Sequence, residues 1–197
     1  MTKPENPTRG RILHVAGELF YQEGVRGAGV DLISEKAGIT KQTLYRYFPS
    51  KDELIAAYLV ERDVSVRAWL SKAAGAKATT SAELVQGLFH ALGKWFETAG
   101  FRGCSFVNAT VESGSSNEAT RAIAKSHKDQ MRDWLAEAFT KDKRPDPQSL
   151  ATKVMILVDG AIASSVVQGS RKPALVAAEI ADTLLQANPP RRSTKKG

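Results

Sequence analysis

The 197-residue sequence has little of what disulfide, metal and membrane proteins require. Its one cysteine, Cys104, allows no internal disulfide and no site built from several cysteines. The three histidines, at positions 14, 90 and 127, are isolated from one another. The longest uncharged apolar run, residues 54–60, is far shorter than the roughly 20 residues of a membrane-spanning helix. We therefore expect no metal, no cofactor and no membrane association.

Signals for secretion and for common enzyme classes are also missing. The first seven residues contain no apolar segment of a signal peptide, which predicts a cytoplasmic protein. The phosphate-loop, dinucleotide, serine-hydrolase and zinc-protease motifs are absent, and the glycines of residues 24–29 have the wrong spacing for a dinucleotide site. We expect no catalytic residues. A scattered serine, histidine and aspartate set is the alternative that the sequence leaves open.

Positive charge is in excess, with a formal net charge of +7 and a pI near 9.6. One group of bases lies in the last nine residues, which is typical of a solvated chain end. A second group falls within sixteen residues with no acid between its members, which favours an anionic partner. This second group consists of Lys36, Lys41, Arg46 and Lys51.

Apolar residues recur at helical spacing along most of the chain, and alternating strand patterns are scarce. The pattern predicts an all-α fold of about nine helices. They are expected near residues 8–23, 30–37, 41–48, 51–72, 81–98, 104–113, 116–139, 147–167 and 173–187. Capping sequences mark several of the starts. These are Thr40, Ser50 with Glu53, Thr80 with Glu83, Ser115 with Glu118, and Asp146 before Pro147.

The second and third predicted helices meet at Gly38-Ile39-Thr40. Glycine permits a sharp turn, the isoleucine fills the gap between the helices, and the threonine caps the next helix. On that helix Leu44 and Phe48 form the buried pair. The opposite face carries Gln42, Thr43 and Arg46, flanked by Lys41, Tyr45 and Tyr47. Such side chains suit base edges and phosphates in a DNA major groove, whereas the alternative is an ordinary helical hairpin with a solvated face.

The segment GITKQTLYRYFPSKDEL, residues 38–54, resembles the signature of tetracycline-repressor (TetR) family transcription regulators. The end of the first predicted helix, FYQEG, resembles that family too, so the resemblance is specific over about residues 9–55. It implies double-stranded operator DNA as a partner, a homodimer and a small-molecule effector. The DNA contacts that it implies are Thr40, Lys41, Gln42, Thr43, Tyr45, Arg46, Tyr47 and Lys51.

Three parts are expected along the chain. Residues 1–50 are predicted to form a helix-turn-helix DNA-binding domain, and residues 51–188 a helical effector-binding and dimerisation domain. Residues 189–197 are predicted to form a basic, disordered tail. One departure from the family is the absence of Thr or Ser at Ala28-Gly29, where a hydroxyl usually caps the second helix. Loss of such a cap costs roughly 1 kcal/mol. In addition, Asp31 is expected to lie near the DNA surface.

Small side chains on the last two predicted helices favour close helix packing between two protomers. The expected interface consists of Gly160, Ala161, Ser164, Ala177, Ala178, Ala181, Leu184 and Leu185. The alternative is that these same faces pack within one chain.

The effector pocket is the least specific expectation. Apolar and sulfur-containing bulk predicts a small, mainly apolar ligand. The candidate contacts are Phe89, Cys104, Asn108, His127, Met131, Trp134 and Met155. The predicted function is therefore an effector-released repressor. The alternatives are a repressor that responds to electrophiles or oxidants through Cys104, and a helical interaction protein that does not bind DNA.

Overall fold

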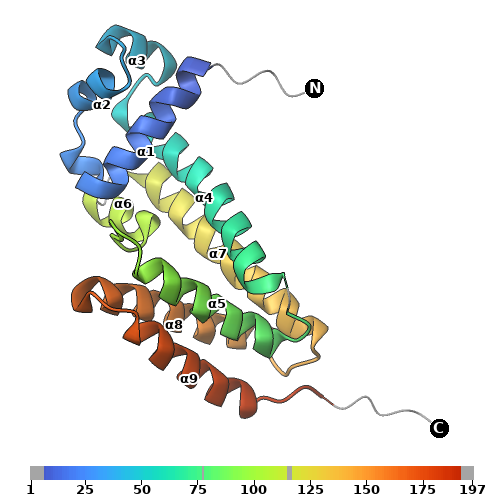
Figure 1. Ribbon diagram of the computed structural model, residues 1–197. Helices are drawn as coiled ribbons and strands as arrows, with labels where there is room; N and C mark the ends of the chain where they lie inside the picture. The colour runs from blue at the N-terminus through green and yellow to red at the C-terminus, as the bar shows by residue number, and fades with distance from the viewer. Residues whose placement is uncertain (1–6, 77, 115–116, 192–197) are drawn as a thin grey trace. The chain divides into compact units, whose positions relative to one another are not determined.

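The computed structural model describes residues 7–76, 78–114 and 117–191. Within these residues the chain forms nine α-helices and no strand, so the prediction of an all-α fold is confirmed (Figure 1). The helices are α1 (Pro7–Gly27), α2 (Val30–Lys36), α3 (Lys41–Tyr47), α4 (Lys51–Gly75), α5 (Ser81–Phe96), α6 (Ser105–Ser113), α7 (Glu118–Lys141), α8 (Pro147–Gln168) and α9 (Lys172–Gln186).

The predicted caps set most of the helix starts. Thr80 and Glu83 form a complete capping box at α5. The Ser50 hydroxyl accepts a hydrogen bond from the Glu53 amide at 3.1 Å, and Asp146 accepts one from the Ser149 amide at 3.3 Å. Ser115 lies outside the described residues. Helix α7 begins later than expected, where the Asn117 side chain accepts from the Thr120 amide at 2.9 Å.

The chain divides into two compact units, each built from separate stretches of sequence. The first comprises residues 1–65 and 104–127, and the second comprises residues 66–103 and 128–197. Helices α4 and α7 each contribute residues to both units. This division concerns compactness alone. The functional domains expected at residues 1–50 and 51–188 stay predictions, and residues 192–197 of the expected tail lie outside the described residues.

The first unit packs α1, α2, α3 and α6 with the N-terminal part of α4 around an apolar core. Its most buried large side chains are Ile12, Ile33, Leu44, Leu54 and Leu59. Helix α1 contacts both α2 and α6, and α2 contacts α3. Gly24 has φ of 82° and ψ of 160°, which interrupts α1 where the sequence predicts its end.

The second unit is centred on α5, α8 and α9, which lie side by side in Figure 1. Helix α9 packs against both α8 and α5. Helix α8 is long and apolar enough to cross a membrane by length and composition alone, among the described helices. Within the protein, 44% of its most apolar window is buried, and a helix of a protein core can pass the same test of length and composition.

Candidate nucleic-acid interface

A tight turn joins α2 to α3, as the sequence predicts. Gly38 adopts φ of 62°, a left-handed conformation that glycine reaches without strain. The Ile39 amide donates to the Ser34 carbonyl at 3.0 Å, and the Ile39 side chain packs against the core. The Thr40 hydroxyl then accepts from the Thr43 amide at 3.1 Å and caps α3. Both ends of the turn are thus hydrogen-bonded, which fixes the direction in which α3 leaves α2.

Helix α3 has one buried edge and one accessible face. Leu44 is fully buried, and Phe48, which follows the helix, is 3% exposed. The exposed predicted DNA contacts are Thr40, Lys41, Gln42, Tyr45 and Arg46, whereas Thr43, Tyr47 and Lys51 are half-buried. The structure therefore brings the recognition-helix residues together on one accessible surface of the first unit.

Lys41 does not stand free on this surface, because its ammonium pairs with the carboxylate of Asp31 on α2. Gly29 stands at the N-cap of α2 and provides no side-chain cap, as expected from the sequence. Asp31 therefore lies beside Lys41, a predicted DNA contact, and forms an ion pair with its ammonium. Both side chains are more than half exposed, so the pair adds little to folding stability.

Lys51 at the start of α4 lies close to the turn that follows Gly24. Its Nζ donates to the carbonyl oxygen of Arg26 at 3.4 Å. Partial burial lowers the pKa of Lys51 from its ordinary value, while the negative charges of Asp52 and Glu112 oppose that shift. The ammonium is therefore positioned by the protein, unlike the freely extended lysine of a solvated surface.

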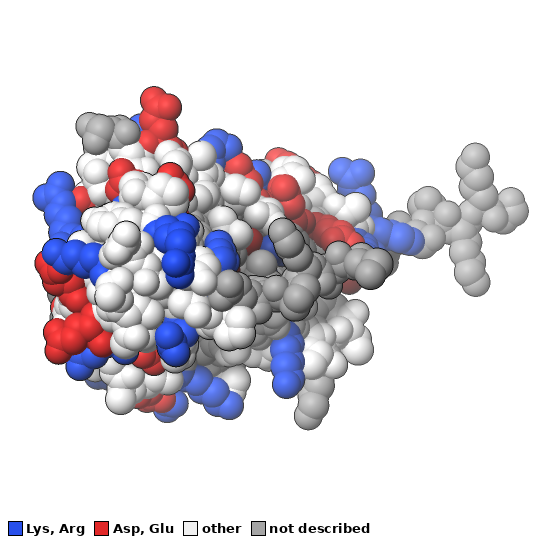
Figure 2. All heavy atoms as spheres, turned by 90° about the horizontal axis from the view of Figure 1, so that it is seen from above, with Lys and Arg blue, Asp and Glu red and all other residues white. Residues whose placement is uncertain are grey.

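Two arginines of this region lie over aromatic rings. The guanidinium of Arg46 lies 5.4 Å from the centre of the Tyr47 ring, and that of Arg9 lies 5.0 Å from the Phe48 ring. Stacking of this kind limits the side-chain freedom that a DNA contact would otherwise cost. On the face shown in Figure 2, acidic and basic side chains are both present. The predicted DNA-binding region is therefore characterised by the positions of individual Lys and Arg side chains and not by a continuous positively charged surface.

The seven predicted effector contacts fall into both compact units. Cys104, Asn108 and His127 belong to the first unit, whereas Phe89, Met131, Trp134 and Met155 belong to the second. His127 is buried, with Nδ1 2.7 Å from an Asp63 carboxylate oxygen and its ring stacked on Phe106 at 3.8 Å. It is therefore already engaged by protein groups. In the described part of the chain, no three His, Cys, Asp or Glu side chains lie together as a metal site would require.

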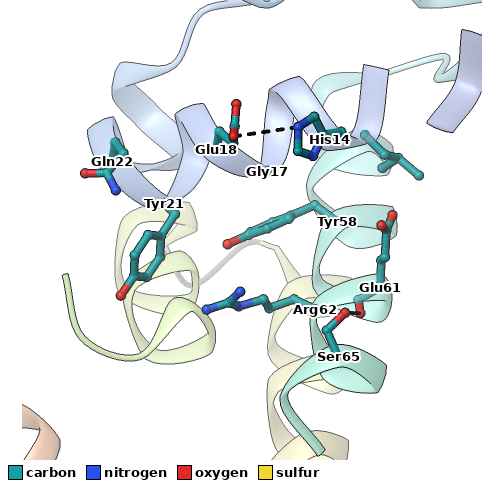
Figure 3. A pocket seen from close by; sticks show the side chains of 10 residues that line it. His14, Gly17, Glu18, Tyr21, Gln22, Tyr58, Glu61, Arg62 and Ser65 are labelled. Carbon is teal, nitrogen blue, oxygen red and sulfur yellow. Dashed lines mark hydrogen bonds and ion pairs between the residues drawn. The ribbon is translucent and has the colours of Figure 1, made fainter. Parts of the chain in front are cut away.

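A groove in the first unit lies between α1 and α4 and has a volume of about 540 Å³ (Figure 3). Arg62 reaches toward Tyr21 there, with its guanidinium 5.3 Å from the ring centre. None of the predicted effector contacts lines this groove. A second cavity of about 420 Å³, in the second unit, is lined by Trp134 and by residues around the start of α5.

Half of the predicted dimer contacts are buried inside the protomer. Ala161, Ala177, Ala181 and Leu185 are at most 5% exposed, where α8 and α9 pack on each other and on α5. Side chains buried in this way cannot form the surface of a partner contact. Gly160 is exposed, and Ser164, Ala178 and Leu184 are partly exposed.

The outer surface of α8 and α9 carries apolar residues that the sequence reasoning missed. Ile156 is 66% exposed and Val167 is 87% exposed, and Val176 and Ile180 on α9 are about half exposed. Together with Gly160 and Ala163, the two α8 side chains recur every three or four residues, so they share one face of the helix. We call these six residues the outer apolar face. Exposed apolar patches of this kind mark association surfaces.

Comparison with known families covers both halves of the chain. The family described as "Bacterial regulatory proteins, tetR family" matches residues 12–58. The family described as "Transcriptional regulator LmrA/YxaF-like, C-terminal domain" matches residues 81–180, which is more than half of the chain. The first match includes the whole of α2 and α3, and the second includes α5 and α8 with most of α9.

Individual relatives agree with these matches. Over 56 residues the chain is 43% identical to the HTH-type transcriptional activator FasR of Mycolicibacterium smegmatis, covering 28% of this chain and 26% of FasR. The match thus spans about a quarter of that relative.

Solved structures match over nearly the whole chain. SCO4454, a TetR-family regulator from Streptomyces coelicolor, is 28% identical with a TM-score of 0.83, covering 91% of this chain and 95% of that one. A cysteine mutant of the TetR-family regulator CifR, complexed with 26bp double-strand operator DNA, shares the fold at 21% identity and a TM-score of 0.77, covering 92% and 98%. The chain therefore belongs to the TetR family of transcription regulators, with a helix-turn-helix DNA-binding domain that contains α2 and α3.

Proposed function

We propose that this regulator represses transcription in the cytoplasm by binding a pseudo-palindromic operator as a homodimer. A small, mainly apolar effector releases it. The observation that carries the proposal is the accessible face of α3, on which Lys41, Gln42 and Arg46 lie opposite the buried Leu44. In CifR, a protein of the same fold, the partner is operator DNA. FasR is named an activator, so the direction of regulation is part of what an experiment must decide.

Each predicted contact has a role that follows from its chemistry. Lys41, Gln42, Thr43 and Arg46 read base edges in the major groove, because their donors and acceptors match those edges. Tyr45, Tyr47 and Lys51 fix the register by contacting phosphates, and Thr40 holds the start of the helix. No catalytic role is proposed, since regulators of this family are generally not enzymes.

The homodimer is proposed to form through the outer apolar face, with Ser164, Ala178 and Leu184 at its border. This revises the interface expected from the sequence, because the burial of Ala161, Ala177, Ala181 and Leu185 leaves other residues to meet the partner. A twofold dimer presents two copies of α3 to two half-sites, spaced by one DNA turn or a multiple of it.

Release requires two arrangements of the protein that bind the effector with different affinity. Helix α4 is continuous from Lys51, a predicted phosphate contact, to Gly75 in the second unit. It is therefore the element proposed to transmit effector binding to the DNA contacts. An effector that binds both arrangements equally would release nothing.

The test is a selection of genomic DNA from the source organism with the purified protein, followed by salt titration on the best fragment. A tight, palindromic site whose affinity falls steeply with salt supports the proposal, because phosphate contacts release counterions. The neighbouring genes, measured with and without the protein, then distinguish repression from activation. Failure to enrich any fragment, both as purified and after refolding to remove a carried-over effector, would contradict the proposal.

A further inference from the structure

A carboxylate from α6 lies in the break within α1. Gly24 leaves the helical conformation, and the Ala28 amide then donates to the Gly24 carbonyl at 3.1 Å, so a new helical turn begins at Gly24. The first amides of a helical turn need an acceptor, which the residue before the turn usually supplies from its side chain. Glycine has no side chain to do this. The Arg26 amide donates instead to Glu112 Oε2 at 3.1 Å.

The space at Gly24 is matched to this carboxylate. A Cβ atom built on Gly24 would lie 2.5 to 2.8 Å from the carboxylate atoms of Glu112, closer than real Cβ contacts. The backbone conformation of Gly24, with φ of 82°, also disfavours any other residue. The backbone conformation therefore favours glycine here, and the absence of a side chain leaves room for the Glu112 carboxylate.

The turn held by Glu112 also holds a predicted DNA contact. The Arg26 carbonyl accepts the hydrogen bond from Lys51 Nζ, and Glu112 acts on the same ammonium through its charge. Helix α2 begins only a few residues later, at Val30, and its N-cap residue Gly29 provides no side-chain cap. The last turn of α1, which follows Gly24, therefore receives a capping acceptor from α6, which is distant in sequence.

We propose that Glu112 is a positioning residue for DNA binding. It holds the turn of residues 24–28, and through that turn Lys51 and the start of α2, in the arrangement that meets a duplex. It does so without contacting the DNA itself. Because Glu112 belongs to α6, the DNA contacts depend on where α6 lies. The role on DNA rests on the proposed function, whereas the capping contact does not.

Two variants separate the capping contact from the charge of Glu112. Glu112→Gln keeps an oxygen acceptor for the Arg26 amide but removes the negative charge beside Lys51. Glu112→Ala removes both. Glu118→Ala, an exposed acid in the first turn of α7, is the matched control for loss of one negative charge in the same unit.

The first measurement is hydrogen exchange at the Arg26 amide, followed by NMR in the full-length protein. We expect exchange to be about tenfold faster in Glu112→Ala, as for loss of a hydrogen bond to a charged acceptor, and less affected in Glu112→Gln. The second measurement is affinity for the selected operator. Glu112→Ala should bind several-fold more weakly, whereas Glu112→Gln should bind as tightly as the unmodified protein or more tightly, because it repels phosphate less.

The outcomes distinguish the inference from the function beneath it. Unchanged Arg26 exchange in Glu112→Ala would overturn the capping contact. Equal strengthening of operator binding in both Glu112 variants would show an effect of charge alone and overturn the positioning role. A protein that binds no duplex would overturn the proposed function and, with it, the role of Glu112 on DNA, while the exchange result would still decide the capping contact.

Discussion

At the scale of single residues, Lys41 has to leave or share its partner Asp31 before it can contact DNA. Asp31 also brings a negative charge close to the proposed path of the phosphates. Asp31→Asn should therefore raise operator affinity, by roughly three- to tenfold, because removal of a like charge near the ligand favours association. Fluorescence anisotropy with labelled operator measures this directly. Thermal stability should change little, since the pair is exposed.

The control for this prediction is the same substitution in a Lys41→Ala background. If Asp31 acts by holding Lys41, most of the gain should vanish there, as a double-mutant cycle would report. Weaker operator binding by Asp31→Asn alone would contradict the proposed place of α2 beside the duplex.

Arg46 and Lys51 are expected to fail in different ways when truncated. Arg46→Ala should cost about 1–3 kcal/mol of operator affinity and relax sequence preference, because it loses a base contact. Lys51→Ala should weaken all duplexes about equally and make the salt dependence shallower by about one unit. Competition binding with operator and scrambled duplexes over a salt series separates the two. If both variants bind operator like the unmodified protein, the assignment of α3 as recognition helix is wrong.

At the scale of helices, starts were predictable where a short polar signal lies beside the residues that it serves. At four helix starts, a side chain accepts a hydrogen bond from the amide three residues later, so a segment of four residues contains both partners. The accepting residues are Thr40, Ser50, Thr80 and Asp146. The cap that Glu112 supplies to Arg26 could not be predicted in this way. Its two partners are 86 residues apart, and only the fold brings them together.

The C-terminal end of α9 is held by another long-range contact. Arg144 is 8% exposed, and its guanidinium donates to the Ser81 hydroxyl at 2.7 Å and to the carbonyls of Leu185 and Asn188 at 2.7 and 2.8 Å. Arg144→Met should therefore cost about 3 kcal/mol of the free energy of unfolding, because it leaves buried acceptors without donors. Urea unfolding followed by circular dichroism measures the loss.

The matched control for that prediction is Arg171→Met. Arg171 is exposed and forms an ion pair with Glu97 at 3.4 Å, which predicts a loss below about 1 kcal/mol. Similar losses in the two variants would mean that the buried hydrogen bonds of Arg144 do not hold α9.

At the scale of the whole molecule, the family and fold were predictable because the signature of residues 38–54 lies in one continuous segment. The surface available to a partner was not, and α8 shows why. The side chains of α8 itself are apolar or small on most of its faces, so helical periodicity does not indicate which face is buried. Only packing against α5 and α9 decides that Ala161 is buried and Ile156 is exposed. For the same reason, the sequence does not distinguish residues that contact an effector from ordinary core residues. Phe89 and Met155 are buried in the second unit, as core residues would be without any ligand.

The outer apolar face leads to a prediction about assembly. Ile156→Glu places a charge on this face, where burial against a second copy would be costly. We expect the variant to sediment as a monomer under conditions in which the unmodified protein sediments as a dimer. Because a monomer presents one α3 to one half-site, its operator affinity should fall by more than about tenfold. Helical content should be unchanged, since the side chain is exposed within the protomer.

The control is Val60→Glu, which introduces the same charge at a 55% exposed apolar position on α4, in the first unit. It should leave the dimer intact, whereas loss of dimer in both variants, or in neither, would contradict the assignment of this face to the interface.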